Sequence, residues 1–168
     1  DPADIHQAKT RLVNIENTNN RGGGSVWDLN EVKQLRKLCD ARGLSLHMDG
    51  ARIFNALTVS KEEPRSWGAQ LDSVSICLSK GLGAPVGSVL VGSRAFITEG
   101  RRIRKRFGGG MRQAGILAAA GLYALDHHVE RLAEDHLRAK RLEAALLDLP
   151  FIEQVIPVET NIVISTLH

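Results

Sequence analysis

The first half of the chain alternates between short apolar runs and segments with the spacing of an amphipathic helix. Strand-like runs are expected at residues 12–15, 44–48, 71–77 and 88–91. After the first run, Val32, Leu35 and Leu38 share one face of a helix that we expect to have Asn30 as its N-cap and to end at Gly43. Strands that alternate with helices are typical of a largely parallel sheet covered by helices. The sequence therefore predicts a three-layer α/β fold.

The remaining elements are predicted from the same patterns. A short helix is expected over 51–57 and a surface loop over 60–68. Three further helices are expected, from Ser93 as N-cap to about Phe107, from Met111 to about Asp126, and from Val129 to Leu149. The tail is expected to form short strands such as 161–165, and residues 1–9 a connector or a short helical turn.

Composition excludes several classes of protein. The 168 residues are 43% hydrophobic and 24% charged, which is typical of a globular chain with one domain and a real core. A formal net charge of +3 is too small to indicate binding to nucleic acid or to an anionic membrane. No apolar run is long enough to span a bilayer, and no signal peptide is evident at the start, which also lacks an initiator Met, as a fragment would.

Neither the cysteines nor the histidines suggest a metal site. Cys39 and Cys77 lack metal-ligand spacing, so we expect small hydrophobic residues in a reducing compartment, with the cytoplasm as the expected location. His127, His128 and His136 have no metal-binding partners at useful spacing, and we expect them at the surface. The sequence therefore predicts no metal.

Three polar residues each follow a strand-like run. Asn17, Asp49 and Lys80 occupy these positions, and ligands of parallel α/β sheets bind beyond the carboxyl ends of the strands. Lys80 enters a turn rich in glycine, where we expect its amine to be partly desolvated and able to attack a carbonyl carbon. A surface lysine and a helix-capping aspartate are the plain alternatives. Together, an aspartate for a pyridine nitrogen and a lysine for an aldehyde suit pyridoxal phosphate.

Three segments carry a more specific resemblance. HMDGARIFNA at 47–56, DSVSICLSKGLGAPVGSVLVGS at 72–93 and RKRFGGGMRQAGILAAAGLYALD at 104–126 resemble the low-specificity L-threonine aldolases. IENTNNRGGG at 15–24 is similar to a loop of the same family. These are pyridoxal-phosphate enzymes of the aspartate aminotransferase fold. The resemblance covers nearly the whole chain and implies retro-aldol cleavage of L-threonine or L-allo-threonine, β-hydroxy-α-amino acids, to glycine and acetaldehyde.

The resemblance also implies site residues. By it, Lys80 is the lysine that forms the imine with the cofactor, and Asp49 faces the pyridine nitrogen. Arg52 holds the substrate carboxylate, a task suited to a forked cation. Lys105 and Arg112 match basic positions near the cofactor that reach a neighbouring subunit's site, and Asn17 approaches the cofactor from the first strand. A phosphate contact of Ser79 and an anion site at 108–110 stay open. His47 is either a supporting partner of Asp49 or a core histidine, and the core position is the favoured one.

The same resemblance implies two domains and suggests that the chain is part of a longer enzyme. Residues 1–126 are expected to form part of the large domain that binds pyridoxal phosphate, and 127–168 a linking helix and the start of a C-terminal small domain. We expect a homodimer or homotetramer. We also expect a portion of a longer enzyme that is not active alone, because the phosphate-binding turn and a stacking histidine of the family are absent.

Two other functions remain open. The chain could be a truncated or degenerate relative that binds partners without catalysis, although the presence of Asp49, Arg52 and Lys80 argues against decay of the site. It could also be another enzyme of the same fold, such as a β-eliminating lyase or a glycine hydroxymethyltransferase. Measuring acetaldehyde release against release of ammonia and keto acid separates these reactions.

Overall fold

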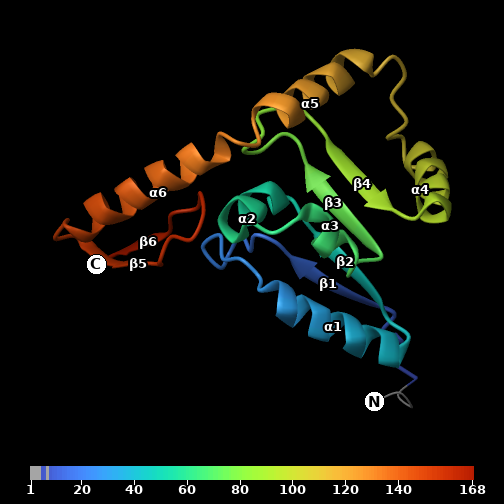
Figure 1. Cartoon of the computed structure of the whole chain (residues 1–168), viewed down its shortest axis with the longest axis horizontal. Helices are drawn as coiled ribbons and strands as arrows, with labels where there is room; N and C mark the ends of the chain where they lie inside the picture. The colour runs from blue at the N-terminus through green and yellow to red at the C-terminus, as the bar shows by residue number, and fades with distance from the viewer. Residues whose placement is uncertain (1–4, 7) are drawn as a thin grey trace.

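A four-stranded sheet forms the centre of the molecule. The computed structural model describes residues 5, 6 and 8–168. The strands are β1 (Leu12–Glu16), β2 (Ser45–Asp49), β3 (Ser73–Cys77) and β4 (Ser88–Gly92), and they lie in that order across the sheet (Figure 1). The first three run parallel and β4 runs antiparallel to β3. The predicted α/β fold with a largely parallel sheet is therefore confirmed.

One face of the sheet carries the main hydrophobic core. It is covered by α1 (Leu29–Arg42), α2 (Ile53–Ser60) and α3 (Pro64–Gly68). Side chains alternate along β2, so that Leu46 and Met48 are fully buried against these helices while His47 and Asp49 point to the opposite, polar face. This alternation separates the residues that stabilise the fold from those available to a ligand.

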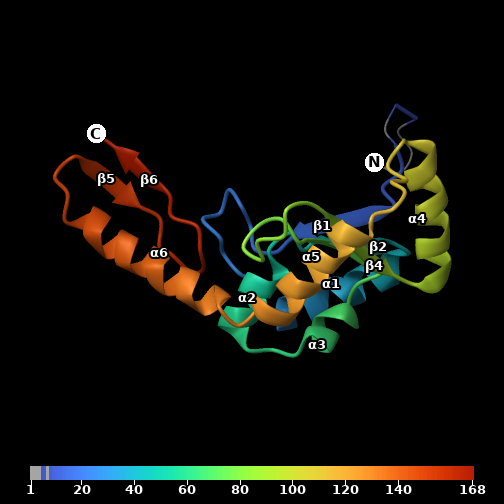
Figure 2. The ribbon, with the colours of Figure 1, turned by 90° about the horizontal axis from the view of Figure 1, so that it is seen from above.

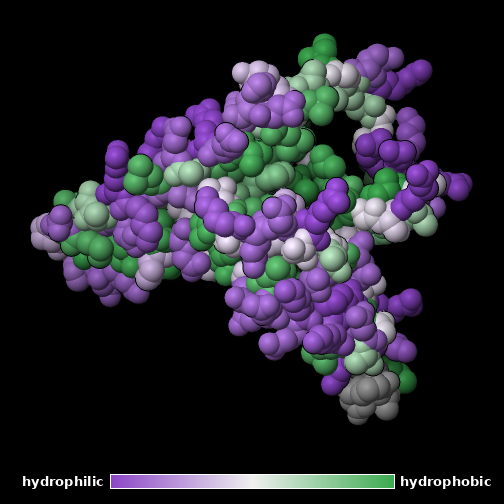
Figure 3. All heavy atoms as spheres, viewed as in Figure 1, coloured by the Kyte–Doolittle hydropathy of each residue, from purple (hydrophilic) through white to green (hydrophobic). Residues whose placement is uncertain are grey.

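The opposite face is covered only in part among the described residues. Helix α4 (Arg94–Arg106) lies over β4, where a Cβ atom added to Gly100 would come within 3.8 Å of Leu90 Cδ2, yet no residue of α4 is buried (Figure 2). Helices α5 (Gly115–His127) and α6 (Leu132–Leu147) follow. A second, smaller core joins them to the loop after β3, with Leu82, Ala84, Ala124 and Leu132 buried. Figure 3 shows hydrophobic residues gathered between α5 and the strands.

The C-terminal segment folds back onto the loop that follows β1. Strands β5 (Ile152–Val155) and β6 (Ser165–Leu167) pair antiparallel in a sheet of their own. The Thr160 hydroxyl donates a hydrogen bond of 2.8 Å to the carbonyl of Gly24, and the Val26 N–H donates one of 3.0 Å to Glu159. The C-terminal segment is thus attached to the turn at 22–24, which was predicted because three glycines follow one another there.

Helix ends match the sequence where a capping residue is decisive. Gly43 ends α1 in the left-handed conformation, with φ of 63°, and the Ser93 hydroxyl accepts from the Phe96 N–H at 3.2 Å, which confirms both predictions. Asn30 as N-cap is wrong. The carboxylate of Asp28 accepts from the N–H groups of Asn30 and Glu31 instead, so α1 begins two residues earlier.

Three other predicted boundaries are wrong. Residues 60–68 are not entirely a loop, because Pro64–Gly68 forms α3 and buries Trp67. Helix α5 begins at Gly115 rather than Met111, since Gln113 has φ of +51° and interrupts any earlier helix. In the tail, the segment 161–164 is outside the strands, which lie at Ile152–Val155 and Ser165–Leu167.

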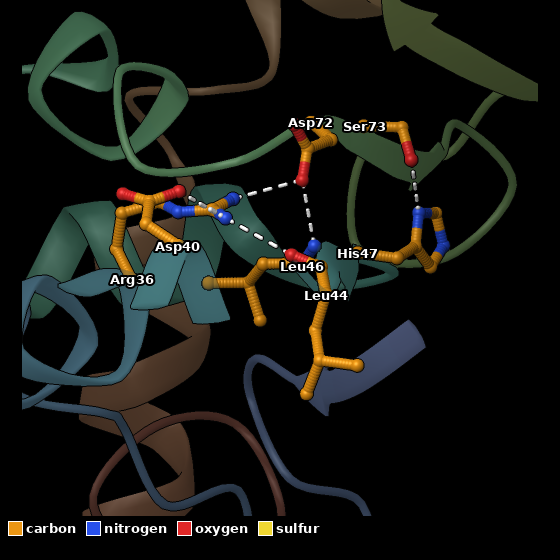
Figure 4. A network of polar contacts seen from close by, with 7 residues as sticks. All are labelled: Arg36, Asp40, Leu44, Leu46, His47, Asp72 and Ser73. Atoms are coloured by element: carbon orange, nitrogen blue, oxygen red, sulfur yellow. Dashed lines mark hydrogen bonds and ion pairs between the residues drawn. The ribbon is translucent and has the colours of Figure 1, made fainter. Parts of the chain in front are cut away.

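A polar network closes the amino ends of β2 and β3 (Figure 4). The Arg36 guanidinium bonds Asp72 at 2.8 Å, Asp40 at 2.6 Å and the carbonyl of Leu44 at 3.1 Å. Asp72 also accepts from the Leu46 N–H at 2.7 Å. That backbone hydrogen bond first, and the Arg36 guanidinium next, hold the pKa of Asp72 below its usual value.

The remaining predictions on organisation have mixed outcomes. Residues 1–4 and 7 of the predicted connector 1–9 lie outside the described residues. The predicted division between 126 and 127 falls at the end of α5 and remains a prediction. No helix in the described part of the chain is both long and apolar enough to cross a membrane.

Candidate active site

The carboxyl ends of the three parallel strands bring the predicted polar residues to one edge of the sheet. Glu16, Asp49 and Ser75 are directly paired across β1, β2 and β3. Asn17 follows the first of these residues, and Lys80 comes five residues after the third. In Figure 1 the arrowheads of β1 and β3 point toward this edge. The structure therefore places Asn17, Asp49 and the Lys80 loop side by side, as neighbouring strands require.

Asp49 is held in place by the backbone around it. Its Oδ1 accepts a hydrogen bond of 3.1 Å from the Ala51 N–H, and its carbonyl accepts one of 2.9 Å from the Asn17 N–H. The next position requires a glycine, because a Cβ atom added to Gly50 would lie 2.8 Å from Val74 Cγ2 and 3.1 Å from the carbonyl oxygen of Ser75. The tight turn leaves Asp49 half-buried on the polar face, and a second carboxylate oxygen remains as a possible acceptor for a ligand.

Asn17 and Thr18 are buried polar side chains that find no partner in the described part of the chain. Asn17 is 0% exposed and Thr18 is 1% exposed. Neither the amide nitrogen and oxygen of Asn17 nor the hydroxyl of Thr18 has a hydrogen-bond partner among the described residues. Buried polar atoms nearly always have partners, because leaving them unpaired destabilises the fold. Beside Asp49, these atoms fit a polar ligand that would satisfy them.

Lys80 lies on a short connection between β3 and β4. The connection is closed by hydrogen bonds from the Leu78 N–H to Gly87 at 2.9 Å and from the Gly83 N–H to Lys80 at 2.8 Å. Leu82 and Ala84 are buried, but the Lys80 side chain is exposed. The expected partial desolvation of its amine is therefore wrong for the described residues, because none of them covers this side of the loop.

Arg52 lies between Asp49 and helix α2. It is the residue before the first turn of α2, it is half-buried, and its carbonyl accepts from the Asn55 N–H at 2.9 Å. Arg52 comes three residues after Asp49, in the short segment between β2 and α2. It therefore adds a permanent cation to the segment that follows Asp49.

The other predicted site residues lie apart from this group. Lys105 is in the last turn of α4 and Arg112 is in the connection to α5, and both are exposed. No hydrogen bond or ion pair in the described part of the chain joins either residue to Asp49 or Lys80. The predicted anion site at 108–110 is wrong as a helix N-terminus, because α5 begins only at Gly115. His47 bonds Ser73 at 2.8 Å across the paired strands.

Sequence reasoning missed the histidines behind the Lys80 loop. His136 Nε2 lies 3.0 Å from the Asn55 amide nitrogen, and His128 Nδ1 lies 2.5 Å from the Leu82 carbonyl. Both rings are half-buried, so the expected surface position is wrong. Helical spacing could have indicated that His136 faces the interior, because it follows the buried Leu132 by one turn and precedes the buried Ala139 by three residues.

The chemistry of these residues fits pyridoxal phosphate and gives no indication of a metal. Within the described residues, no group of three or more His, Cys, Asp and Glu side chains is arranged to bind a metal ion. The strand ends supply an amine at Lys80, a carboxylate at Asp49 and unpaired buried amide atoms at Asn17. These are the functional groups that would bind an aldehyde, a protonated ring nitrogen and a ring hydroxyl, respectively. The residues present therefore fit the cofactor.

Comparison with curated proteins points to the same family. The chain is 46% identical over 161 residues to a probable low-specificity L-threonine aldolase 2 of Arabidopsis thaliana, covering 95% of this chain and 45% of that protein. It is 53% identical over 135 residues to a low specificity L-threonine aldolase of Escherichia coli, covering 80% of this chain and 40% of that protein. The resemblance seen in the sequence is confirmed, and the chain spans less than half the length of these relatives.

Solved structures agree on the fold. A putative L-allo-threonine aldolase of Listeria monocytogenes superposes with a TM-score of 0.82 at 24% identity, over 89% of this chain and 42% of that one. At this identity the likeness supports the fold alone. The sequence also matches the family described as beta-eliminating lyase over residues 1–168, which is the whole chain. The chain therefore belongs to the beta-eliminating lyase family.

Proposed function

We propose that this chain supplies the catalytic strand ends of a pyridoxal-phosphate aldolase that cleaves L-threonine or L-allo-threonine to glycine and acetaldehyde. The observation that carries the proposal is the placement of Asp49, Arg52 and Lys80 at one edge of the sheet. Relatives that are 46% and 53% identical are named low-specificity L-threonine aldolases, which supports the substrate.

Each residue has a separate task in this proposal. Lys80, on an exposed loop, would hold the cofactor covalently through its amine, and Asn17 would bind it with the amide atoms that lack protein partners. Asp49 would keep the ring nitrogen protonated by accepting its hydrogen bond. Arg52 would bind the substrate carboxylate and so orient the amino acid. Lys105 and Arg112 would serve the site of a neighbouring subunit.

The bond that breaks is the one between Cα and Cβ of the substrate. Bound pyridoxal phosphate supplies an electron-accepting ring next to Cα. The β-hydroxyl loses its proton and becomes the carbonyl of acetaldehyde, and Cα gains a proton to give glycine. Arg52 contributes by fixing the carboxylate, which determines the direction of the Cα–Cβ bond relative to the ring.

The proposal is tested by substitution of Lys80 in the full protein. Lys80→Ala should lower acetaldehyde release from L-threonine by at least about a hundredfold, the lower limit for removing a group that acts directly in the reaction. It should also abolish the borohydride-reducible attachment of the cofactor. Lys37→Ala, on the exposed face of α1, is the matched control and should keep both. Retention of attachment in Lys80→Ala would contradict the assignment.

A second reaction deserves a direct comparison because of the family description. The matched family is described as beta-eliminating lyase, and one neighbouring solved structure is titled as a putative aromatic amino acid beta-eliminating lyase/threonine aldolase. An eliminating enzyme would release ammonia and a keto acid, whereas the aldolase releases acetaldehyde and glycine. Measuring both products from the same preparation decides between them.

The proposed function also suggests a domain division, an assembly and a cellular location. We propose that residues 1–126 belong to a large cofactor-binding domain and 127–168 to the start of a small domain. A homodimer or homotetramer in the cytoplasm, acting in threonine catabolism and glycine biosynthesis, is the setting that suits this activity. Sedimentation of the full protein, with and without pyridoxal phosphate, tests the assembly.

A further inference from the structure

Helix α6 reaches the back of the Lys80 loop. Gly81, the residue after Lys80, faces this helix so closely that an added Cβ atom would lie 2.9 Å from Leu132 Cδ2. The same position is 3.6 Å from the Asn55 side-chain oxygen. Asn55 is 3% exposed and belongs to α2, one turn after Arg52. Three elements therefore meet directly behind the proposed cofactor lysine.

His136 completes the polar part of this contact. Its Nε2 lies 3.0 Å from the Asn55 amide nitrogen. An amide nitrogen only donates, so Nε2 must be the unprotonated acceptor and the ring proton must be on Nδ1. A protonated ring would place two donors against each other in a half-buried position. The contact thus needs a neutral His136.

A second histidine fixes the next residue of the loop. His128 Nδ1 lies 2.5 Å from the carbonyl of Leu82, which only accepts, so this nitrogen carries a proton. His127, the neighbouring residue, is exposed, and its ring centroid lies 4.4 Å from that of Tyr123. His128 thus contacts the loop itself and His136 contacts Asn55 of α2, whereas His127 is at the surface.

We propose that His136 is a positioning residue for Lys80. Through Asn55 and the close contact at Gly81, its neutral ring fixes the Lys80 loop and the first turn of α2 relative to each other. Lys80 and Arg52, which these two segments carry, are then held in a fixed position relative to each other. This inference rests on the proposed function, because it assigns His136 to the geometry of that site.

The charges around His136 indicate which protonation state is favoured. Burial is the largest influence and lowers the pKa of His136 below its usual value. The adjacent Asp135 carboxylate opposes this shift, and the Lys61 ammonium just after α2 adds to it. Asn55 is the uncharged partner from α2. The neutral ring is therefore the form present near pH 7.

The tautomer can be measured without the cofactor. In the full protein labelled with 15N-histidine, and with His136→Gln to assign the signal, His136 should show the Nδ1–H form near pH 7. Its pKa should lie below the usual value for histidine. An Nε2–H form, or a pKa at or above that usual value, would overturn the proposal whether or not the protein cleaves threonine.

Variants then test the link to Lys80. His136→Met keeps the bulk but loses the acceptor, and should weaken cofactor attachment by roughly tenfold, the effect of losing one buried hydrogen bond. His136→Gln keeps an acceptor, so it should retain most of the cofactor attachment. Because glutamine does not titrate, the loss of attachment that protonation of His136 causes at acid pH should be absent in this variant. His127→Gln is the control and should match the unaltered protein.

The outcomes separate this inference from the proposed function. If the unaltered protein attaches the cofactor at Lys80 and His136→Met attaches it equally well at every pH, the positioning role is wrong while the function stands. If the unaltered protein attaches none, the proposed function fails, and the positioning role falls with it. If His136→Met does not fold, the tautomer measurement on the unaltered protein still decides.

Discussion

The two ends of the central sheet are built in opposite ways. At the amino ends of β2 and β3, Arg36, Asp72 and the backbone of residues 44–46 are joined in a single network, in which the Arg36 Nε is left without a partner among the described residues. At the carboxyl ends, no side-chain polar atom of the buried Asn17 and Thr18 has a partner among the described residues, and Lys80 is exposed. Protein atoms supply most of the partners at one end, whereas a ligand could supply them at the other.

This difference separates stability from function along the same strands. A satisfied network stabilises the fold, whereas buried polar atoms left unpaired destabilise it and persist only where something else is gained. Substitutions at the amino end should therefore change the free energy of unfolding, and substitutions at the carboxyl end should change binding and catalysis. Four variants test this division, in order of decreasing effect.

Asp49→Asn should have the largest effect. An amide cannot stabilise the protonated ring nitrogen as a carboxylate does, so cleavage of L-threonine should fall by on the order of a hundredfold. The free energy of unfolding without cofactor should change little, because the side chain has one hydrogen bond to the Ala51 N–H that an amide oxygen can also accept. Steady-state kinetics and urea unfolding measure the two quantities. A loss of stability without loss of activity would remove Asp49 from the site.

Asn17→Leu should change stability and cofactor binding in opposite directions. The change removes two unpaired buried atoms at similar volume, so the free energy of unfolding without cofactor should rise by about 1 kcal/mol. Affinity for pyridoxal phosphate should fall by roughly tenfold. Thermal unfolding and cofactor titration provide the readouts. Destabilisation of the cofactor-free protein would show that Asn17 is satisfied by protein atoms after all.

Asp72→Asn tests the network at the amino ends of β2 and β3. The pKa of this carboxyl is lowered by the Leu46 N–H and by Arg36, so the carboxylate stabilises the fold above its unfolded pKa of about 3.9. That contribution is lost as the pH falls from this value through the lower folded pKa. Near pH 7 we expect a loss of about 1 kcal/mol, since the group is half-exposed and screened, with unchanged activity. The variant should also lose this acid dependence of stability, as urea unfolding between pH 2 and 7 would show.

Asp40→Ala should have the smallest effect. Its ion pair with Arg36 is 2.6 Å long, but the Asp40 side chain is 66% exposed. Such a pair contributes less than about 0.5 kcal/mol and is weakened by salt. Urea unfolding at low and high ionic strength should show a small difference that vanishes at high salt. A larger loss, equal to that of Asp72→Asn, would mean that the network acts as one unit.

The sequence was most informative where one residue determines local geometry. Gly43 and Ser93 marked helix ends correctly because a left-handed C-cap and a hydroxyl N-cap each act within a few residues. Asn17, Asp49 and Lys80 were brought to one edge because parallel strands share a direction. The start of α1 was misplaced because Asp28 and Asn30 are both good N-caps, and only the structure shows which accepts.

Contacts between distant segments could not be predicted in this way. The bond between Asn55 and His136 joins residues 81 positions apart, and nothing local to either residue specifies its partner. Trp67 is a similar case, because its burial against the core depends on α2 and β2 rather than on the surrounding loop residues. The exposure of Lys80 also depends on distant segments, because no neighbouring residue determines what covers its loop.

The antiparallel return of β4 has a consequence for the order of folding. Partners in β3 and β4, such as Ser75 and Leu90, are closer in sequence than partners in β1 and β2, such as Val13 and Leu46. Closing the shorter loop costs less chain entropy, so the β3–β4 hairpin should form early and the parallel pairs later. Lys80 is thus carried on an early hairpin, and its final position is fixed only when α6 docks behind it.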